Sequence, residues 1–119
     1  MIIEIGLQGH AETLVEKEDT AQAVGSGGLL VYATPCLAAL MEGAAYESIA
    51  PFLAEGESTV GTRMDVKHLS ATPVGMEVRA ESVVTAAGSA APVVVVVSAT
   101  AVAMPKSLVR NSMRISSFR

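Results

Sequence analysis

The sequence contains a carboxylate and an imidazole whose positions suit general acid–base chemistry. Glu42 lies inside an apolar segment, where a buried carboxylate is costly unless it is paired or used in a reaction. His68 ends a stretch of alternating residues and falls on its apolar side. A carboxylate that orients an imidazole and balances its charge makes a general acid–base unit. We therefore predict that Glu42 and His68 act together, with a solvent-facing glutamate and a core histidine as the plain alternatives.

Two further candidates stand at the expected start of a helix, where Thr34 suits the N-cap and Pro35 suits the first helical position. There the Thr34 hydroxyl, the free N–H groups and the helix dipole can polarise a carbonyl. The alternative is an ordinary cap, worth about 1 kcal/mol. Cys36 is a rival nucleophile, because a thiol at a helix N-terminus has a lowered pKa. The one cysteine and the two histidines have no ligand-like spacing, so no metal site is expected.

The segment that carries Thr34 and Glu42 is predicted to be a buried helix. It starts at Thr34 and ends between Ser48 and Pro51, and its residues are apolar almost all the way round. A helix of this kind is buried on most sides. The neighbouring strands must therefore wrap it.

Alternation of apolar and polar residues predicts two of these strands. Residues 58–69 form one strand and residues 76–81 form the next, and a turn at residues 71–73 joins them into an antiparallel hairpin. The predicted inward faces are Val60, Thr62, Met64, Val66 and His68 in the first strand, and Met76, Val78 and Ala80 in the second.

Weaker signals place the remaining strands. Residues 7–16 suit a half-buried edge strand, and residues 83–104 suit a third strand with the turn before it. Residues 108–118 suit a last strand, in which Arg110 and Arg114 would face water.

A loop rich in glycine, Gly25–Gly28, precedes the predicted helix. In a dinucleotide-binding fingerprint the third glycine would fall on Leu30, and no clear strand precedes the loop. We therefore expect a flexible connection rather than a phosphate-binding loop.

Charge is distributed unevenly along the chain. All twelve acidic residues lie at or before Glu81, and no charge occurs between Glu81 and Lys106. That stretch contains Gly88, Pro92 and a run of valines, so we expect strands and a turn rather than a membrane helix. A net charge of −4 and a pI of about 5.0 argue against nucleic acid as the main partner. The N-terminus does not resemble a secretory signal and there is a single cysteine, so we expect a cytoplasmic protein.

The predicted elements combine into one domain spanning residues 1–119, since a second core would leave each half of so short a chain marginal. An antiparallel sheet wrapped around one long central helix is a hotdog-like α+β fold. With an exposed sheet edge and a surplus of apolar residues, such a small domain is expected to form a homodimer or a higher homo-oligomer.

Several motifs resemble those of hotdog-fold acyl-CoA thioesterases of the fluoroacetyl-CoA thioesterase type. The resemblance implies a catalytic set of Thr34, Glu42 and His68, a substrate-binding role for Gly61, and no cofactor. The motifs are Val24-Gly25-Ser26-Gly27-Gly28, then Ala33-Thr34-Pro35 with Glu42 eight residues after the threonine, then Val60-Gly61-Thr62 and a histidine at 68.

The implied activity is hydrolysis of a small acyl-CoA thioester to the free acid and CoA, with Thr34, Glu42 or water as the attacking group. The alternatives are an acyl-CoA or acyl-carrier binding module without turnover, and a hydratase or dehydratase of the same fold. The loop before the helix lacks the aromatic residues associated with fluoroacetyl-CoA, so fluoroacetate resistance is not predicted. Because CoA carries phosphates, Arg110, Arg114 or Lys106 could hold its nucleotide end across a dimer interface, and a solvated basic tail is the alternative.

Overall fold

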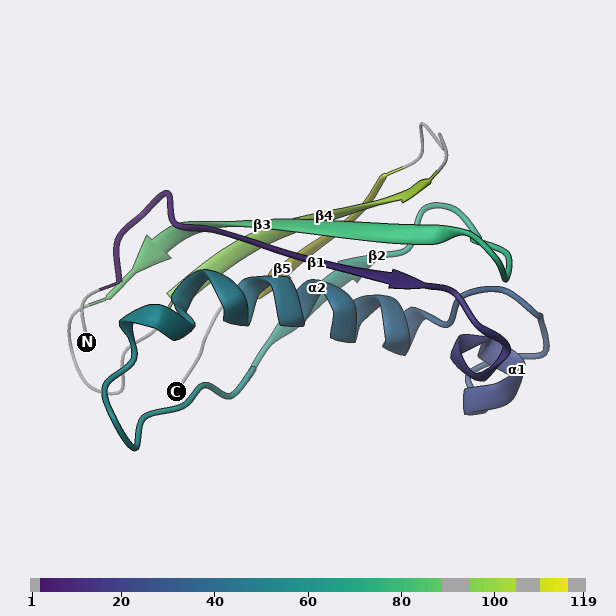
Figure 1. Ribbon diagram of the computed structural model, residues 1–119, viewed down its shortest axis with the longest axis horizontal. Coiled ribbons are helices and arrows are strands. Elements are labelled where there is room, and N and C mark those ends of the chain that lie inside the picture. Colours follow the sequence, from purple (N-terminus) through teal and green to yellow (C-terminus); the bar gives the residue numbers. More distant parts are fainter. Residues whose placement is uncertain (1–2, 89–94, 105–109, 116–119) are drawn as a thin grey trace.

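One helix lies across one face of an antiparallel sheet in the computed structural model, which describes residues 3–88, 95–104 and 110–115 (Figure 1). Within these residues the sheet has five strands in the order β1-β3-β4-β5-β2. The strands are β1 (Gln8–Leu14), β2 (Met64–Lys67), β3 (Glu77–Ala87), β4 (Val95–Met104) and β5 (Arg110–Ile115). The long helix is α2 (Thr34–Ile49), and the short helices are η1 (Lys17–Asp19), α1 (Ala21–Val24) and η2 (Ala50–Phe52). The predicted α+β hotdog architecture is confirmed.

Helix α2 begins one residue earlier than the capping pattern predicts. Thr34 is its first residue, and Ala33 is the N-cap, without a side-chain hydrogen bond to the helix. The prediction that Thr34 caps the helix is therefore wrong, because its hydroxyl bonds to a distant side chain instead. The predicted end is correct, since the helix stops at Ile49 and a short 3-10 turn follows.

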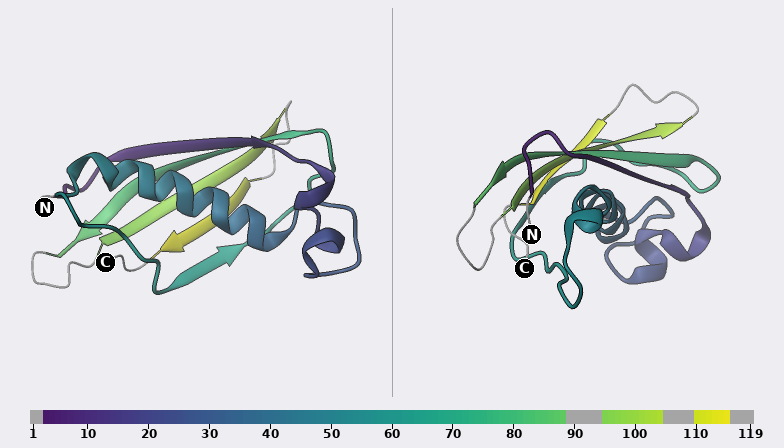
Figure 2. Two further views of the ribbon diagram at one scale, coloured as in Figure 1. Left: turned by 60° about the horizontal axis from the view of Figure 1, so that its bottom comes forward. Right: turned by 60° about the vertical axis from the view of Figure 1, so that its left-hand side comes forward.

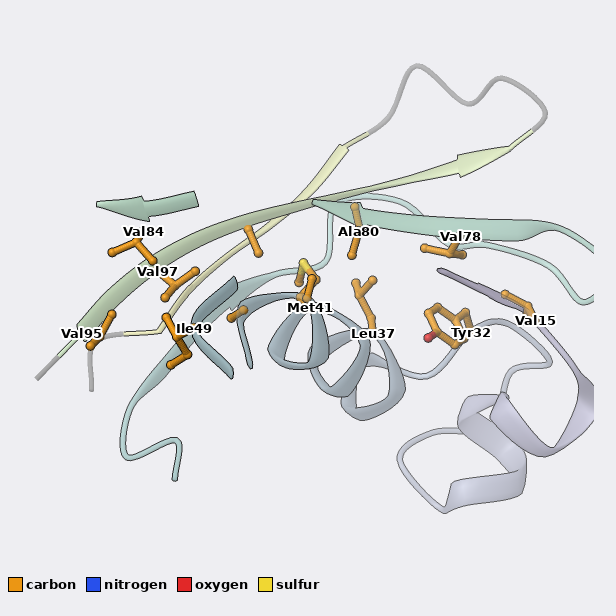
Figure 3. Close-up of a cluster of buried hydrophobic side chains, with 14 residues drawn as sticks. Val15, Tyr32, Leu37, Met41, Ile49, Val78, Ala80, Val84, Val95 and Val97 are labelled. Atoms are coloured by element: carbon orange, nitrogen blue, oxygen red, sulfur yellow. The ribbon is translucent and has the colours of Figure 1, made fainter. Parts of the chain in front are cut away.

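The core lies between α2 and the concave face of the sheet (Figure 3). Helix residues Leu37, Met41 and Ile49 are buried against inward side chains of β3 and β4 such as Val84 and Val97. The inward face predicted for β3 is confirmed, because alternate residues of that strand are buried. The buried residues of β3 are Val78, Ala80, Ser82 and Val84.

The sheet covers only one side of α2, as the end-on view of the helix shows (Figure 2). On the other side Ala39, Gly43 and Tyr46 are exposed. The expected wrapping of the helix by the sheet is therefore present on one side, and closure of its other side by a second subunit stays a prediction.

Strand β2 is shorter than predicted and pairs with a different neighbour. It spans only Met64–Lys67 and forms the edge of the sheet beside β5. The predicted hairpin of β2 with β3 is wrong, because β1 and β4 occupy both edges of β3. Val60 and Met64 are exposed rather than inward-facing, whereas Val66 and His68 are half-buried.

The uncharged stretch forms strands, as predicted. It supplies the end of β3 and all of β4, which pair antiparallel, while the turn between them lies outside the described residues. The predicted edge strand and the predicted last strand are present as β1 and β5. No helix among the described residues has the length and apolar character needed to span a membrane.

The closest approach of β1 to α2 occurs at Gly9. A Cβ atom at this position would overlap the Ala44 carbonyl oxygen and lie 2.7 Å from the Ser48 backbone nitrogen. Both obstacles are helix backbone, which cannot rotate aside. Gly9 therefore sets the distance between helix and sheet.

We expect Gly9→Ala to lower the free energy of unfolding by about 2 kcal/mol, because the new methyl group pushes the helix off the sheet. The matched control is Gly43→Ala on α2, where a Cβ meets nothing within 4 Å. It should raise the stability by up to about 1 kcal/mol, since alanine favours a helix more than glycine does. Urea denaturation of both variants and the wild type measures the free energies of unfolding. If Gly9→Ala is as stable as the wild type, β1 and α2 are not in tight contact at Gly9.

Candidate active site

A short hydrogen bond joins two of the predicted catalytic residues. Thr34 Oγ1 lies 2.7 Å from Nδ1 of His68, although the residues are far apart in sequence. Thr34 opens α2, and His68 directly follows β2 at the edge of the sheet. The distance is that of a nucleophile and its base, or of a hydroxyl held in place by an imidazole.

The second ring nitrogen of His68 is available for a further hydrogen bond. Nε2 is buried and has no hydrogen-bond partner among the described residues. When the Thr34 hydroxyl donates to Nδ1, the neutral ring carries its proton on Nε2, which then needs an acceptor. A buried polar atom without a partner costs about 1–3 kcal/mol. The imidazole is therefore placed to bind a further group that the described part of the chain does not supply.

The Thr34–His68 pair lies in the wall of a cavity of about 310 Å³ at the N-terminal end of α2. The wall opposite the helix comes from loops that are tied together by backbone contacts. The Tyr32 N–H donates to the Thr72 carbonyl oxygen at 2.7 Å, and Val31 forms a bridge with Pro73. Besides Thr34 and His68, the lining includes Ser26, Val31, Tyr32 and Leu69, together with the small residues Ala21, Ser70 and Ala71.

Glu42 is half-buried, but it does not lie beside His68. It follows Thr34 by eight residues, which corresponds to about 12 Å along the helix axis. Its carboxylate packs against Gly61, where a Cβ atom would overlap Oε2. The structure thus brings together Thr34 with His68 and, separately, Glu42 with Gly61. Within one chain the predicted Glu42–His68 contact is absent from the described residues.

Cys36 is less suited to nucleophilic attack than its position at a helix start suggests. Burial and, secondly, the Asp19 carboxylate raise the pKa of its thiol. The expectation of a lowered pKa is therefore wrong. Burial, followed by the nearby Cys36 and Asp19, also raises the pKa of Tyr32, which keeps its hydroxyl protonated. That hydroxyl donates to the Cys36 carbonyl oxygen at 3.1 Å.

The basic residues predicted to contact CoA lie on β5 or outside the described residues. The register pairs Arg110 with Val102 and Arg114 with Ser98. Lys106 lies outside the described residues. The CoA contact stays a prediction.

Sequence reasoning missed Tyr32 and Ser26 as parts of the site. Tyr32 is almost completely buried, yet it lines the cavity and bonds to the first turn of α2. In the sequence, the one indication that Tyr32 belongs to the site was its position as an aromatic residue two residues before Thr34. Among the described residues, no cluster of histidine, cysteine or acidic side chains could hold a metal ion.

Solved structures that resemble this one include hotdog and thioesterase proteins. A hypothetical protein of Thermus thermophilus, described as a thioesterase superfamily member, is 27% identical with a TM-score of 0.84, over 99% of this chain and 85% of that one. A variant of the fluoroacetyl-CoA thioesterase FlK in complex with acetyl-CoA has a TM-score of 0.84 at 20% identity, over 98% of this chain and 90% of that one. A hot-dog-like protein of Thermanaerovibrio acidaminovorans has a TM-score of 0.80 at 21% identity, over 98% of this chain and 84% of that one.

Sequence comparison gives the family. The fluoroacetyl-CoA thioesterase of Streptantibioticus cattleyicolor is 44% identical over 48 residues, which cover 40% of this chain and 34% of that protein. The match thus spans about a third of the length of this curated relative. The pattern of the fluoroacetyl-CoA-specific thioesterase family matches residues 15–107, which is most of the chain. The protein therefore belongs to the fluoroacetyl-CoA-specific thioesterase family.

Proposed function

We propose that the protein is an acyl-CoA thioesterase that hydrolyses a small acyl-CoA to the free acid and CoA. The observation that carries this proposal is the Thr34–His68 hydrogen bond of 2.7 Å in the wall of a cavity at a helix N-terminus. Membership of the family supports a thioester substrate, and one similar structure is a complex with acetyl-CoA.

The start of α2 suits the carbonyl group of a thioester. The first N–H groups of a helix have no partner within the helix, and the helix dipole places partial positive charge there. A carbonyl oxygen that becomes negative during attack is stabilised by such groups. In the proposed complex the thioester carbonyl therefore lies against the first turn of α2, beside Thr34.

His68 moves the proton in the proposed reaction. It accepts a proton from the attacking hydroxyl, which belongs to Thr34 or to a water molecule held by Thr34. The new C–O bond forms as the C–S bond breaks, and the proton passes to the sulfur of CoA. If Thr34 attacks, water then hydrolyses its ester and regenerates the hydroxyl.

The proposed active form is a homodimer in which Glu42 of one subunit completes the site of the other. Three observations support this arrangement. Glu42 follows Thr34 by about two turns of α2 and does not pair with His68 of its own chain, and Nε2 of His68 has no partner among the described residues. In addition, Val60 and Met64 near the β2 edge and Tyr46 on α2 are exposed apolar side chains beside Glu42 and Gly61. Burial of such side chains favours association.

The remaining proposals concern the CoA moiety and the compartment. Arg110 and Arg114 contact the CoA phosphates across the subunit interface, and Gly61 contributes to substrate binding. The protein acts in the cytoplasm, where a single free thiol such as Cys36 stays reduced.

We expect the wild-type protein to release thiol from at least one short-chain acyl-CoA, and His68→Ala to lower kcat by about 10²-fold to 10⁴-fold, because general acid–base catalysis is lost. A thiol-reactive dye measures the released CoA. The control Cys36→Ala should keep full activity, since this thiol is not the nucleophile.

Two results would contradict the proposed function. One is a His68→Ala variant as active as the wild type. The other is tight acyl-CoA binding by calorimetry without release of thiol from any substrate, which would indicate a binding module instead.

If each active site is formed by two subunits, two inactive variants should complement each other in a mixed dimer. His68→Ala and Glu42→Gln should each be inactive alone, but a mixed dimer contains one site with both native side chains. Unfolding and refolding the two variants together should therefore restore about a quarter of wild-type activity, since half of the dimers are mixed and each has one intact site. If the mixture stays as inactive as its components although exchange is verified by tagged subunits, each site is contained within one chain.

A further inference from the structure

We propose that the hydroxyl of Tyr32 is a positioning group, which holds the start of α2 so that Thr34 keeps its hydrogen bond to His68. Tyr32 does not react in this proposal, and its effect on turnover rests on the proposed thioesterase function.

The first turn of α2 has no side chain that caps it. The N-cap residue Ala33 carries no polar group, and the Thr34 hydroxyl is engaged by His68. Helices commonly begin with a side-chain oxygen that accepts from the N–H of the second or third residue. In α2 the second residue is Pro35, which has no N–H, and the third is Cys36. Other contacts must therefore hold the start of this helix.

The Tyr32 hydroxyl supplies one of these contacts. It donates to the Cys36 carbonyl oxygen at 3.1 Å. The same peptide group carries the Leu37 N–H, which donates to the Ala33 carbonyl oxygen at 2.9 Å. Hydrogen bonds in series polarise and strengthen one another. The hydroxyl thus reinforces the backbone bond that closes the turn containing Thr34.

The backbone of Tyr32 is tied to the segment that carries the other member of the pair. Its N–H donates at 2.7 Å to the carbonyl oxygen of Thr72, four residues after His68. Tyr32 therefore bonds through its side chain to the helix that carries Thr34, and through its backbone to the loop that follows His68. A shift between these two segments changes the distance from the Thr34 hydroxyl to Nδ1 of His68.

Burial of the Tyr32 ring fixes the position of the hydroxyl. The residue is 3% exposed and packs in the core cluster with Leu37 and Val78 (Figure 3). Burial, followed by Cys36 and Asp19, raises the pKa of Tyr32, so the hydroxyl stays protonated and remains a donor. Phenylalanine keeps the ring and its packing and removes only the oxygen. Tyr32→Phe therefore isolates the hydrogen bond.

The kinetic test compares Tyr32→Phe with the wild type in the thiol-release assay. A misplacement of 1 Å can cost about 10²-fold in rate, and for a smaller shift we expect kcat to fall by about tenfold with KM within about twofold. The matched control is Ser82→Ala, which removes another buried hydroxyl that donates to α2, at the Ala44 carbonyl oxygen. It should keep kcat, and both variants should melt within about 5 °C of the wild type.

A second test needs no turnover. The chain has two histidines, and the His68→Ala variant identifies the ring signals of His68 in a nitrogen-15 NMR spectrum. Because Nε2 has no acceptor among the described residues, the Thr34 hydroxyl donating to Nδ1 is what keeps the proton on Nε2. We expect an unprotonated Nδ1 and a protonated Nε2 in the wild type, and shifts averaged between the two neutral tautomers in Tyr32→Phe.

The outcomes separate this proposal from the proposed function. Unchanged His68 shifts in Tyr32→Phe overturn the positioning role, whether or not the protein is active. The same holds if kcat is unchanged or falls equally in Ser82→Ala, and if Tyr32→Phe melts below the assay temperature, which would make the hydroxyl structural only. Changed shifts in a protein that hydrolyses no acyl-CoA support the positioning role and overturn the thioesterase function.

Discussion

The close packing of α2 on the sheet is the constraint on which the rest of the structure depends. Gly9 brings the β1 backbone against the Ala44 carbonyl, and the buried Ser82 hydroxyl of β3 donates to the same oxygen at 2.8 Å. The buried residues of β3 and β4 that face α2 are valine, alanine and serine, which suit so short a distance, while the helix contributes the larger Leu37, Met41 and Ile49.

The position of the helix then fixes the position of the candidate site. Since α2 is held along its length, its first residue, Thr34, has a defined place beyond the strands. Pairing with β5 holds β2 at the sheet edge, and the chain leaves β2 at His68. Two residues distant in sequence therefore meet at a helix N-terminus, where partial positive charge and a neutral base act on the same group.

Local patterns predicted the elements well, and the contacts between them less well. Alternation along β3 identified Val78 and Ala80 as buried, because a strand with one buried face repeats every two residues. The partner of β2 was wrong because the same alternation suits any neighbouring strand, and only the complete sheet shows that β3 has no free edge. The exposed face of α2 could not be located from the helix sequence alone, because its alanines and glycine suit burial and exposure equally.

For the candidate site too, individual residues could be predicted from the sequence, whereas the contacts between them could not. Thr34 and His68 could be chosen from residue type and resemblance, but their mutual hydrogen bond joins separate elements and displaces the predicted cap. The pKa of Cys36 depends on Asp19, a residue of another segment, so a rule based on the helix terminus alone failed. Glu42 was predicted to pair with His68, whereas its carboxylate packs against Gly61, a contact that only the three-dimensional structure shows.

The central claim is that the start of α2, with Thr34 and His68, receives the reacting carbonyl. A crystal structure with a non-hydrolysable acyl-CoA analogue tests it most directly. We expect the carbonyl oxygen within hydrogen-bond distance of the first turn of α2, with its carbon next to the Thr34 hydroxyl. An analogue bound with its carbonyl away from Thr34 and His68 would contradict the account.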